Sequence, residues 1–196
     1  MKGQIVHSPE GQEIVLADIG LVEVFDNPVV RVWDVSLQPG ETHPWHLHHN
    51  PYVVLSISGS ECRMDWLDGA EPRFLSEYRG GAVYRPLSPV HRLTNIGDRF
   101  YQNRLVELKQ LGELRAEPYP VGEGARSAPG PHPGPVLSHE HLRVWTVQAP
   151  TELDLAEVPH VIAALDAPHE VRFHEGGPLK LDGDGEWFVV ELTLPV

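Results

Sequence analysis

One cysteine, Cys62, stands in the whole sequence, so no disulfide can form within the chain. No stretch comes near the roughly 20 consecutive apolar residues that a membrane helix needs. Near the N-terminus, Glu10, Glu13 and Asp18 occupy the region where a secretory signal would carry an apolar run. These absences predict a cytoplasmic protein that does not associate with membranes.

Basic residues are scarce. The 15 lysines and arginines are outnumbered by 28 aspartates and glutamates, which gives a formal net charge of -13. A surface of that charge repels nucleic-acid phosphates and anionic lipids, so neither is an expected partner. Hydrophobic residues at 41% and charged residues at 22% are ordinary for a globular chain with a buried core. The partner that we expect is a small-molecule substrate.

Proline and glycine are plentiful, with 19 and 18 copies, and they mark the turns of a strand-rich chain. Short runs rich in β-branched and aromatic residues lie between these turns. The predicted strands are residues 29–37, 52–58, 61–66, 82–85, 91–95 and 100–109. No window before residue 109 shows the period of an amphipathic helix. The sequence therefore predicts an all-β fold of antiparallel sheets and excludes alternating strand–helix folds.

Residues 112–135 differ in composition from what precedes them, with six prolines and few apolar residues. We interpret this stretch as a Pro/Gly-rich linker. Beyond it, RVWTV at 143–147 repeats the pattern of RVWDV at 31–35, and VEL at 190–192 repeats VEL at 106–108. Because the two echoes stand in the same order, they predict a duplicated strand-rich unit.

The predicted organisation is a first unit at 1–111, the linker at 112–135, and a second, shorter unit at 136–196 that is a degenerate copy of the first. Within the second unit, residues 158–165 are expected to form a short helix. An incomplete second unit leaves an edge strand exposed, so we expect it to pack against the first unit or a second subunit, in a homodimer.

Two of the 12 histidines, His46 and His48, are two residues apart, so in an extended strand both rings project from the same face. Neutral imidazole is a common ligand for zinc, iron, nickel and copper, and a metal site needs three or four ligands that converge on one point. A third ligand must therefore come from another part of the chain.

The segment that holds this pair resembles the first motif of the cupin superfamily, G-x5-H-x-H followed by E and x6-G. Gly40, His46, His48 and Gly59 stand in register with it. The second cupin motif, G-x5-P-x-G-x2-H-x3-N, is matched by Gly80, Pro86, His91 and Asn95, with Ser88 in place of its third conserved residue. The resemblance covers about residues 25–109, and it implies a jelly-roll β-barrel whose ligands point inwards. It implies His46, His48 and His91 as the ligands of one divalent ion, which is iron, manganese, nickel or zinc.

Tyr52 stands where the family has its glutamate ligand. The three remaining histidines look like the iron site of thiol dioxygenases within the same superfamily. Tyr52 is our candidate catalytic residue, with three roles open: ligation as phenolate, a hydrogen bond to a bound water, or packing. His43 and His49 do not share the strand parity of the pair, so we expect them to face solvent or to support the ligands.

Further candidates for contact with a substrate are the strand residues Tyr84, Arg85, Arg92, Tyr101 and Arg104. An inward arginine suits a carboxylate. The function that this implies is a metal-dependent enzyme acting on a small organic acid or related metabolite, with a dioxygenase ahead of an isomerase or lyase. The alternative is a non-catalytic cupin that binds or senses a small ligand.

Overall fold

The computed structural model describes residues 2–117, 123–167 and 169–195. In that part of the chain the regular structure consists of β-strands and one short 3-10 helix, η1 (Lys109–Leu111). Within the same residues, no helix has the length and hydropathy that crossing a membrane requires. The predicted all-β fold is confirmed.

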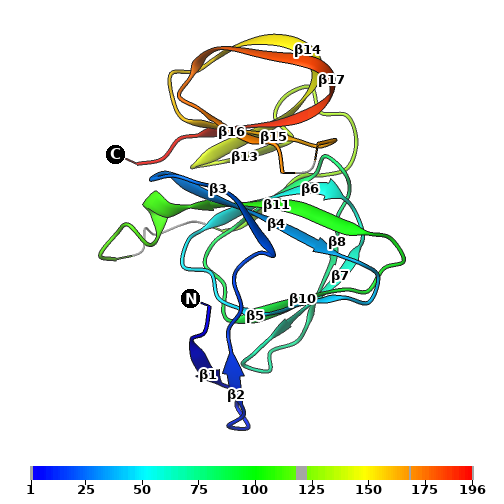
Figure 1. The fold of residues 1–196 in the computed structure, drawn as a ribbon, viewed down its shortest axis with the longest axis vertical. Helices are drawn as coiled ribbons and strands as arrows, with labels where there is room; N and C mark the ends of the chain where they lie inside the picture. The colour runs from blue at the N-terminus through cyan, green and yellow to red at the C-terminus, as the bar shows by residue number, and fades with distance from the viewer. Residues whose placement is uncertain (1, 118–122, 168, 196) are drawn as a thin grey trace.

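Two antiparallel sheets face each other and form a jelly-roll barrel, shown in the lower half of Figure 1. One sheet pairs, in this order, β5 (Thr42–His46), β10 (His91–Asn95), β7 (Glu61–Trp66) and β8 (Arg73–Ser76). The other pairs β12 (Ala125–Arg126), β9 (Ala82–Arg85), β6 (Tyr52–Ser58), β11 (Tyr101–Leu108), β4 (Val30–Leu37) and β3 (Val22–Asp26). A separate hairpin of β1 (Ile5–His7) and β2 (Glu13–Val15) lies at the N-terminal end.

The six predicted strands correspond to β4, β6, β7, β9, β10 and β11, and no end differs by more than one residue. Along β10 buried and half-buried residues alternate, as expected for a strand with one face toward a core. In contrast, the first six residues of β6 are all buried. Both faces of the larger sheet are therefore covered, one by the barrel interior and one by another part of the chain.

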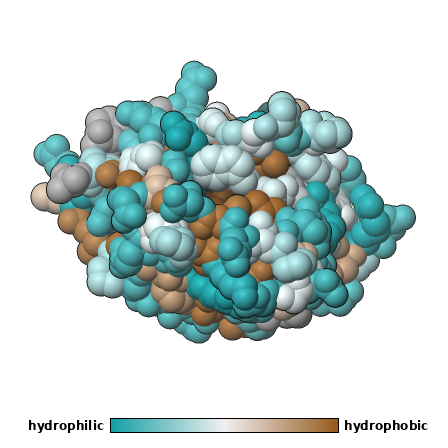
Figure 2. Space-filling view, turned by 90° about the horizontal axis from the view of Figure 1, so that it is seen from above, coloured by the Kyte–Doolittle hydropathy of each residue, from teal (hydrophilic) through white to brown (hydrophobic). Residues whose placement is uncertain are grey.

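The second unit forms a five-stranded antiparallel sheet. Its order is β13 (Leu137–His139), β14 (Leu142–Leu155), β17 (Gly177–Leu192), β15 (His160–Ala164) and β16 (Val171–His174). The long β14–β17 pair curls back at the end of the molecule farthest from the N-terminus (Figure 1). Seen from that end, apolar side chains gather in the middle of the surface and hydrophilic ones surround them (Figure 2).

The pairing of β14 with β17 repeats the pairing of β4 with β11. Arg143 lies opposite Glu191, and Val144 lies opposite Val190. In the first unit, the corresponding residues of the echo, Arg31 and Val32, lie opposite Glu107 and Val106. The two sequence echoes therefore occupy equivalent positions in two sheets, as duplication of a strand-rich unit requires.

The short helix expected at residues 158–165 is wrong, because His160–Ala164 is strand β15. All five residues of β15 are buried, and neighbouring residues join different cores: Val161 and Ala163 face one cluster, Ile162 and Ala164 another. The sequence of a strand that is covered on both faces is a continuous apolar run. Such a run carries no period that distinguishes it from a buried helix.

A single hydrophobic core joins the barrel to the second unit. It combines β4, β6 and β11 residues such as Val32, Val53 and Val106 with second-unit residues such as Val161 and Phe188. Stacked rings of Phe25 and Phe173, 6.2 Å apart, extend this contact. The second unit thus packs against the first, which is one of the two arrangements predicted for it.

The predicted linker contributes to the barrel. Within it, β12 pairs antiparallel with β9, placing Ala125 opposite Tyr84 and adding an edge strand to the larger sheet. Pro118 and Pro120, two of the prolines that define the linker, lie outside the described residues. The division at 1–111, 112–135 and 136–196 stays a prediction.

Candidate metal centre

The barrel brings His46, His48 and His91 together from two adjoining elements. His46 ends β5, His91 begins β10, and the two lie directly opposite each other in the ladder. His48 follows two residues after β5. One ring nitrogen from each lies within 4.8 Å of the others, and all three side chains are buried. The residues that the resemblance implied as ligands thus converge on one point.

Two of the three rings are held by backbone carbonyls. His46 Nδ1 lies 2.8 Å from the carbonyl oxygen of Pro44, and His91 Nδ1 lies 2.8 Å from that of Pro89. A carbonyl only accepts, so the ring proton must reside on Nδ1 and Nε2 is left as a lone-pair donor. This is the usual way in which proteins orient imidazole ligands of a metal.

Burial keeps these imidazoles neutral. Burial, followed by the neighbouring histidines, lowers the pKa values of His46 and His48 well below the ordinary 6.5. Burial lowers the pKa of His91 to about 4. Three neutral, convergent nitrogen donors are a fitting ligand set for one borderline divalent ion, with coordination positions left over for other groups.

His43 was expected to face solvent or to support the ligands, and the expectation of solvent exposure is wrong. Its side chain is buried, its ring lies 4.5 Å from that of His46, and it lines the same cavity. The cause is a β-bulge. His46 pairs with His91 and His43 pairs with Leu93, so β5 advances three residues between these two pairs whereas β10 advances only two. The extra residue reverses the parity of the strand.

A small cavity of about 40 Å³ adjoins the three histidines inside the barrel. This is room for about one water-sized guest beside the ligands. The barrel residues Tyr52, Glu77, Arg85, Tyr101 and Asn103 line it together with apolar side chains. A metal ion held here would therefore lie in a small interior space with both polar and apolar walls.

Glu77 is a cavity residue that the sequence did not reveal. It follows β8 and is buried, and its Oε2 accepts hydrogen bonds from Ser56 Oγ at 2.7 Å and Tyr101 Oη at 3.2 Å. Burial raises the pKa of its carboxyl group. A lone glutamate after a short strand carries no motif, so no sequence signal distinguishes it from a surface residue.

Tyr52 opens β6 and is buried against the metal centre. Its ring stacks on His48 with centroids 4.0 Å apart and planes at 16°. Burial raises the pKa of its phenol, which is therefore neutral at pH 7. Packing is thus part of its role, and its hydroxyl also has a hydrogen-bond interaction with Ser88, which acts against the rise in pKa.

The chain was compared with known proteins. No protein-family model matches it, and no curated protein is significantly similar to it. Among solved structures, a cupin domain from Bordetella pertussis is 25% identical over 45% of this chain and 90% of that one, with a TM-score of 0.41. The protein YhaK from Escherichia coli is 11% identical over 91% of this chain and 92% of that one, with a TM-score of 0.53. AerE from Microcystis aeruginosa is 9% identical over 85% and 93%, with a TM-score of 0.51.

The chain has the cupin fold. At these identities the solved structures bear on the fold alone. The YhaK and AerE matches extend over most of this chain, so the second unit of the cupin is included in the likeness.

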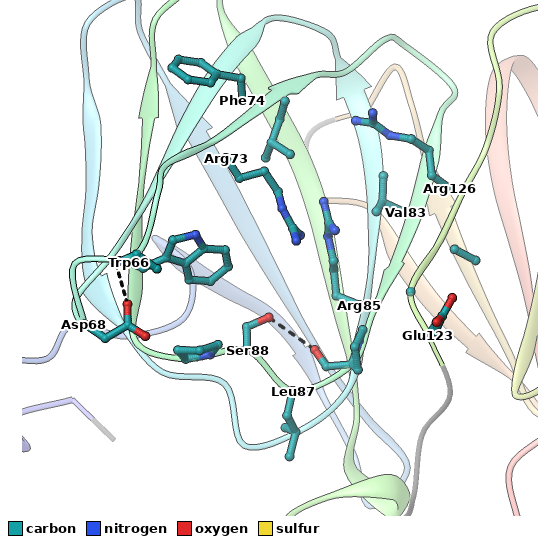
Figure 3. A pocket seen from close by; sticks show the side chains of 16 residues that line it. Trp66, Asp68, Arg73, Phe74, Val83, Arg85, Leu87, Ser88, Glu123 and Arg126 are labelled. Carbon is teal, nitrogen blue, oxygen red and sulfur yellow. Dashed lines mark hydrogen bonds between the residues drawn. The ribbon is translucent and has the colours of Figure 1, made fainter.

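A larger cavity opens at the mouth of the cupin barrel, with a volume of about 670 Å³. Its walls come from the ends of β7, β8 and β9 and from the segment around β12. It shares Leu75 and Arg85 with the small metal cavity, and Trp66 in its wall lies edge-on to His91 at 5.5 Å. A ligand in the mouth would therefore lie next to the metal centre. Figure 3 shows the side chains that line this larger cavity.

The other predicted contact residues divide between the cavities and the rest of the molecule. Arg85 and Tyr101 line the metal cavity. Arg104 is buried in an ion pair with Asp34 at 3.0 Å. Arg92 lies outside both of these cavities, with its guanidinium 4.8 Å from the Trp45 ring. Tyr84 belongs to the core between the units.

The metal-free cupin should lose stability as the pH falls from 7 to 5. The unfolded chain takes up a proton at His91 near pH 6.5, whereas the folded chain does so only near pH 4. Stability present above 6.5 is therefore lost as the pH falls, by about 2 kcal/mol from this group between pH 7 and 5. Denaturant titrations of the wild type and His91→Asn test this. An equal decline in both proteins would contradict it.

Proposed function

We propose that this cupin binds one divalent ion, iron, manganese, nickel or zinc, through His46, His48 and His91. We propose further that it is an enzyme acting on a small organic acid or related metabolite. The convergence of three buried, neutral imidazoles carries the proposal. Such an ion supplies Lewis acidity and open positions at which water, substrate or dioxygen is activated.

Oxygenase chemistry ranks ahead of isomerase or lyase chemistry in this proposal. The ligand set lacks a carboxylate, since Tyr52 occupies the position of the family's glutamate and Glu77 is not within the ligand cluster. The cavity has space for only a small guest beside the ion, and so small a space limits the water that can reach reactive species there. Glu77, held by Ser56 and Tyr101, is placed to exchange a proton with such a guest.

The test begins with metal analysis of protein purified without an affinity tag. The protein, reconstituted with each candidate ion in turn, is then assayed for oxygen uptake with panels of organic acids and thiols. Uptake with one ion and one substrate class supports an oxygenase. Stoichiometric metal with ligand binding but no turnover would instead favour the alternative, a cupin that binds or senses a small ligand.

Replacement of Tyr52 by phenylalanine should leave the metal content unchanged and lower turnover by about 10- to 1000-fold, as for loss of one polar contact in an active site. The phenyl ring keeps the stacking on His48, so only the hydroxyl is lost. Metal analysis and the oxygen-uptake assay measure the two effects separately. Unchanged turnover would mean that the Tyr52 hydroxyl has no part in catalysis and that the residue only packs against its neighbours.

We also propose that the protein is a homodimer. Strand β3 forms one edge of the larger sheet, and both its first residue, Val22, and the preceding Leu21 are exposed. An uncovered edge with apolar side chains favours pairing with another copy. Light scattering at micromolar concentration tests this, and a monomer mass would exclude it.

A further inference from the structure

Three arginines at the mouth of the barrel form no ion pair among the residues that the structure describes, although the buried Glu77 attracts two of them, Arg85 and Arg126. Of the 15 lysines and arginines, ten lie within 4.0 Å of a carboxylate oxygen in the part of the chain that the structure describes. Arg73, Arg85 and Arg126 form no such pair, and all three line the 670 Å³ cavity. In a chain with a net charge of -13, this concentration of arginines outside ion pairs is the feature to be explained.

The three side chains come from both sheets of the barrel, one from the smaller sheet and two from adjoining strands of the larger one. Arg73 begins β8, Arg85 ends β9, and Arg126 lies on β12. Figure 3 shows the guanidinium ends of Arg73 and Arg85 pointing toward one another across the opening, with Arg126 reaching in from the side. Arg126 Nη2 donates to the Ser76 carbonyl oxygen at 3.1 Å, which fixes its position. The three guanidinium groups therefore lie around one opening between the strands.

Like charges that face each other across a cavity repel unless an anion lies between them. The two acidic residues of the lining do not fill this role. In Figure 3, Asp68 lies on one side of the cavity, below Trp66, and Glu123 lies on the other side, below Arg126. Asp68 accepts a hydrogen bond from the Ala70 N–H at 3.0 Å, and neither carboxylate forms an ion pair with the three arginines among the described residues. The guanidinium groups are therefore available to an incoming ligand.

Much of the rest of the cavity wall is apolar. Trp66, Phe74, Leu75, Val83 and Leu87 contribute to it, and Phe74 and Leu87 are exposed. The Arg73 guanidinium lies 5.6 Å from the centre of the Trp66 ring, so the charged and aromatic surfaces adjoin. The volume is far larger than a simple inorganic anion needs.

We propose that the mouth is a binding site for an organic carboxylate with an apolar, ring-sized body, whose carboxylate is gripped by Arg73 and Arg85. The apolar body lies against Trp66. Because Arg85 also lines the metal cavity, the ligand reaches the metal centre from this site. This inference names the substrate class and rests on the proposed function. The planar guanidinium forks match the geometry of a carboxylate.

Calorimetric titration of metal-loaded protein with phenylacetate, phenylacetamide and inorganic phosphate tests the site. Phenylacetate should bind at least about tenfold more tightly than phenylacetamide, which has the same shape without the charge. Phosphate, which lacks the apolar body, should also bind more weakly. Equal binding of phenylacetate and phenylacetamide would overturn the anion site, and tighter binding of phosphate would overturn the carboxylate assignment.

Arg73→Gln and Arg85→Gln should each weaken phenylacetate binding by about 10- to 100-fold. Arg99→Gln is the matched control, because Arg99 is exposed, forms no acidic pair among the described residues and lies outside the cavity. Melting curves establish that each variant is folded. Unchanged affinity in Arg73→Gln and Arg85→Gln, or an equal loss in Arg99→Gln, would refute the proposal.

Metal content measured on the same samples separates this inference from the proposed function. If the protein takes up no metal but binds phenylacetate in a way that depends on Arg73 and Arg85, the carboxylate site is supported and the metal centre is contradicted. If the protein binds metal but does not prefer phenylacetate to phenylacetamide, the metal centre is supported and the carboxylate site is contradicted.

Discussion

Protein with His91 replaced by alanine should contain only trace metal after purification, whereas the wild type should contain it in stoichiometric amount. Removing one of three imidazoles leaves two donors, too few to retain a dication against water and buffer. The double variant His46→Ala/His48→Ala should lose metal for the same reason. Elemental analysis of protein purified without a tag measures both.

His174→Ala is the control, because this histidine lies on β16 in the second unit, away from the cluster. Its metal content should equal that of the wild type. Retention of metal in both variants of the cluster would refute the site, and loss in His174→Ala would point to a second site in the other unit. Circular dichroism of each variant shows that any loss of metal does not follow from unfolding.

Phe188→Ala should lower the free energy of unfolding by about 3–5 kcal/mol, the range for removing a fully buried phenyl group from a core. Phe188 is completely buried in the core shared by the barrel and the second unit. Because that core spans both units, unfolding of the wild type should be one cooperative transition. Denaturant titration followed by fluorescence and circular dichroism measures the loss and tests the coincidence of the transitions.

Phe100→Ala provides the comparison, since Phe100 is 41% exposed and belongs to no core cluster among the described residues. Its effect should stay within about 0.5 kcal/mol, apart from any lost local contact. Two separate transitions in the wild type would mean that the units unfold independently and that the shared core contributes little.

Much of this architecture could be predicted because turns and period-two patterns are local properties. The strands at 52–58, 61–66 and 91–95 match the structure to the residue, since glycine, proline and asparagine define where each ends. The convergence of His46, His48 and His91 followed from motif spacing within one family. The spacing of residues along the chain depends on how the fold pairs its strands, so the spacing of the histidines in the two motifs indicates which of them meet in the barrel.

The failures come from properties that are not local. His43 was misplaced because a bulge is set by pairing with β10, which the sequence of β5 alone does not reveal. Residues 158–165 were misread because burial on both faces depends on which layers cover the strand. Glu77 and Arg73 come from positions without a motif, and only the closed barrel brings them to its cavities.

The shared core has a consequence for synthesis on the ribosome. Translation completes the barrel strands through β11 before residues 136–196 exist, so the apolar outer face of the larger sheet emerges with nothing to cover it. Because translation adds about 5–20 residues per second, this face stays uncovered for several seconds or more until the second unit has been synthesised. The nascent chain in that interval resembles a folding intermediate prone to aggregation, and chaperones that bind apolar surface have their best opportunity then.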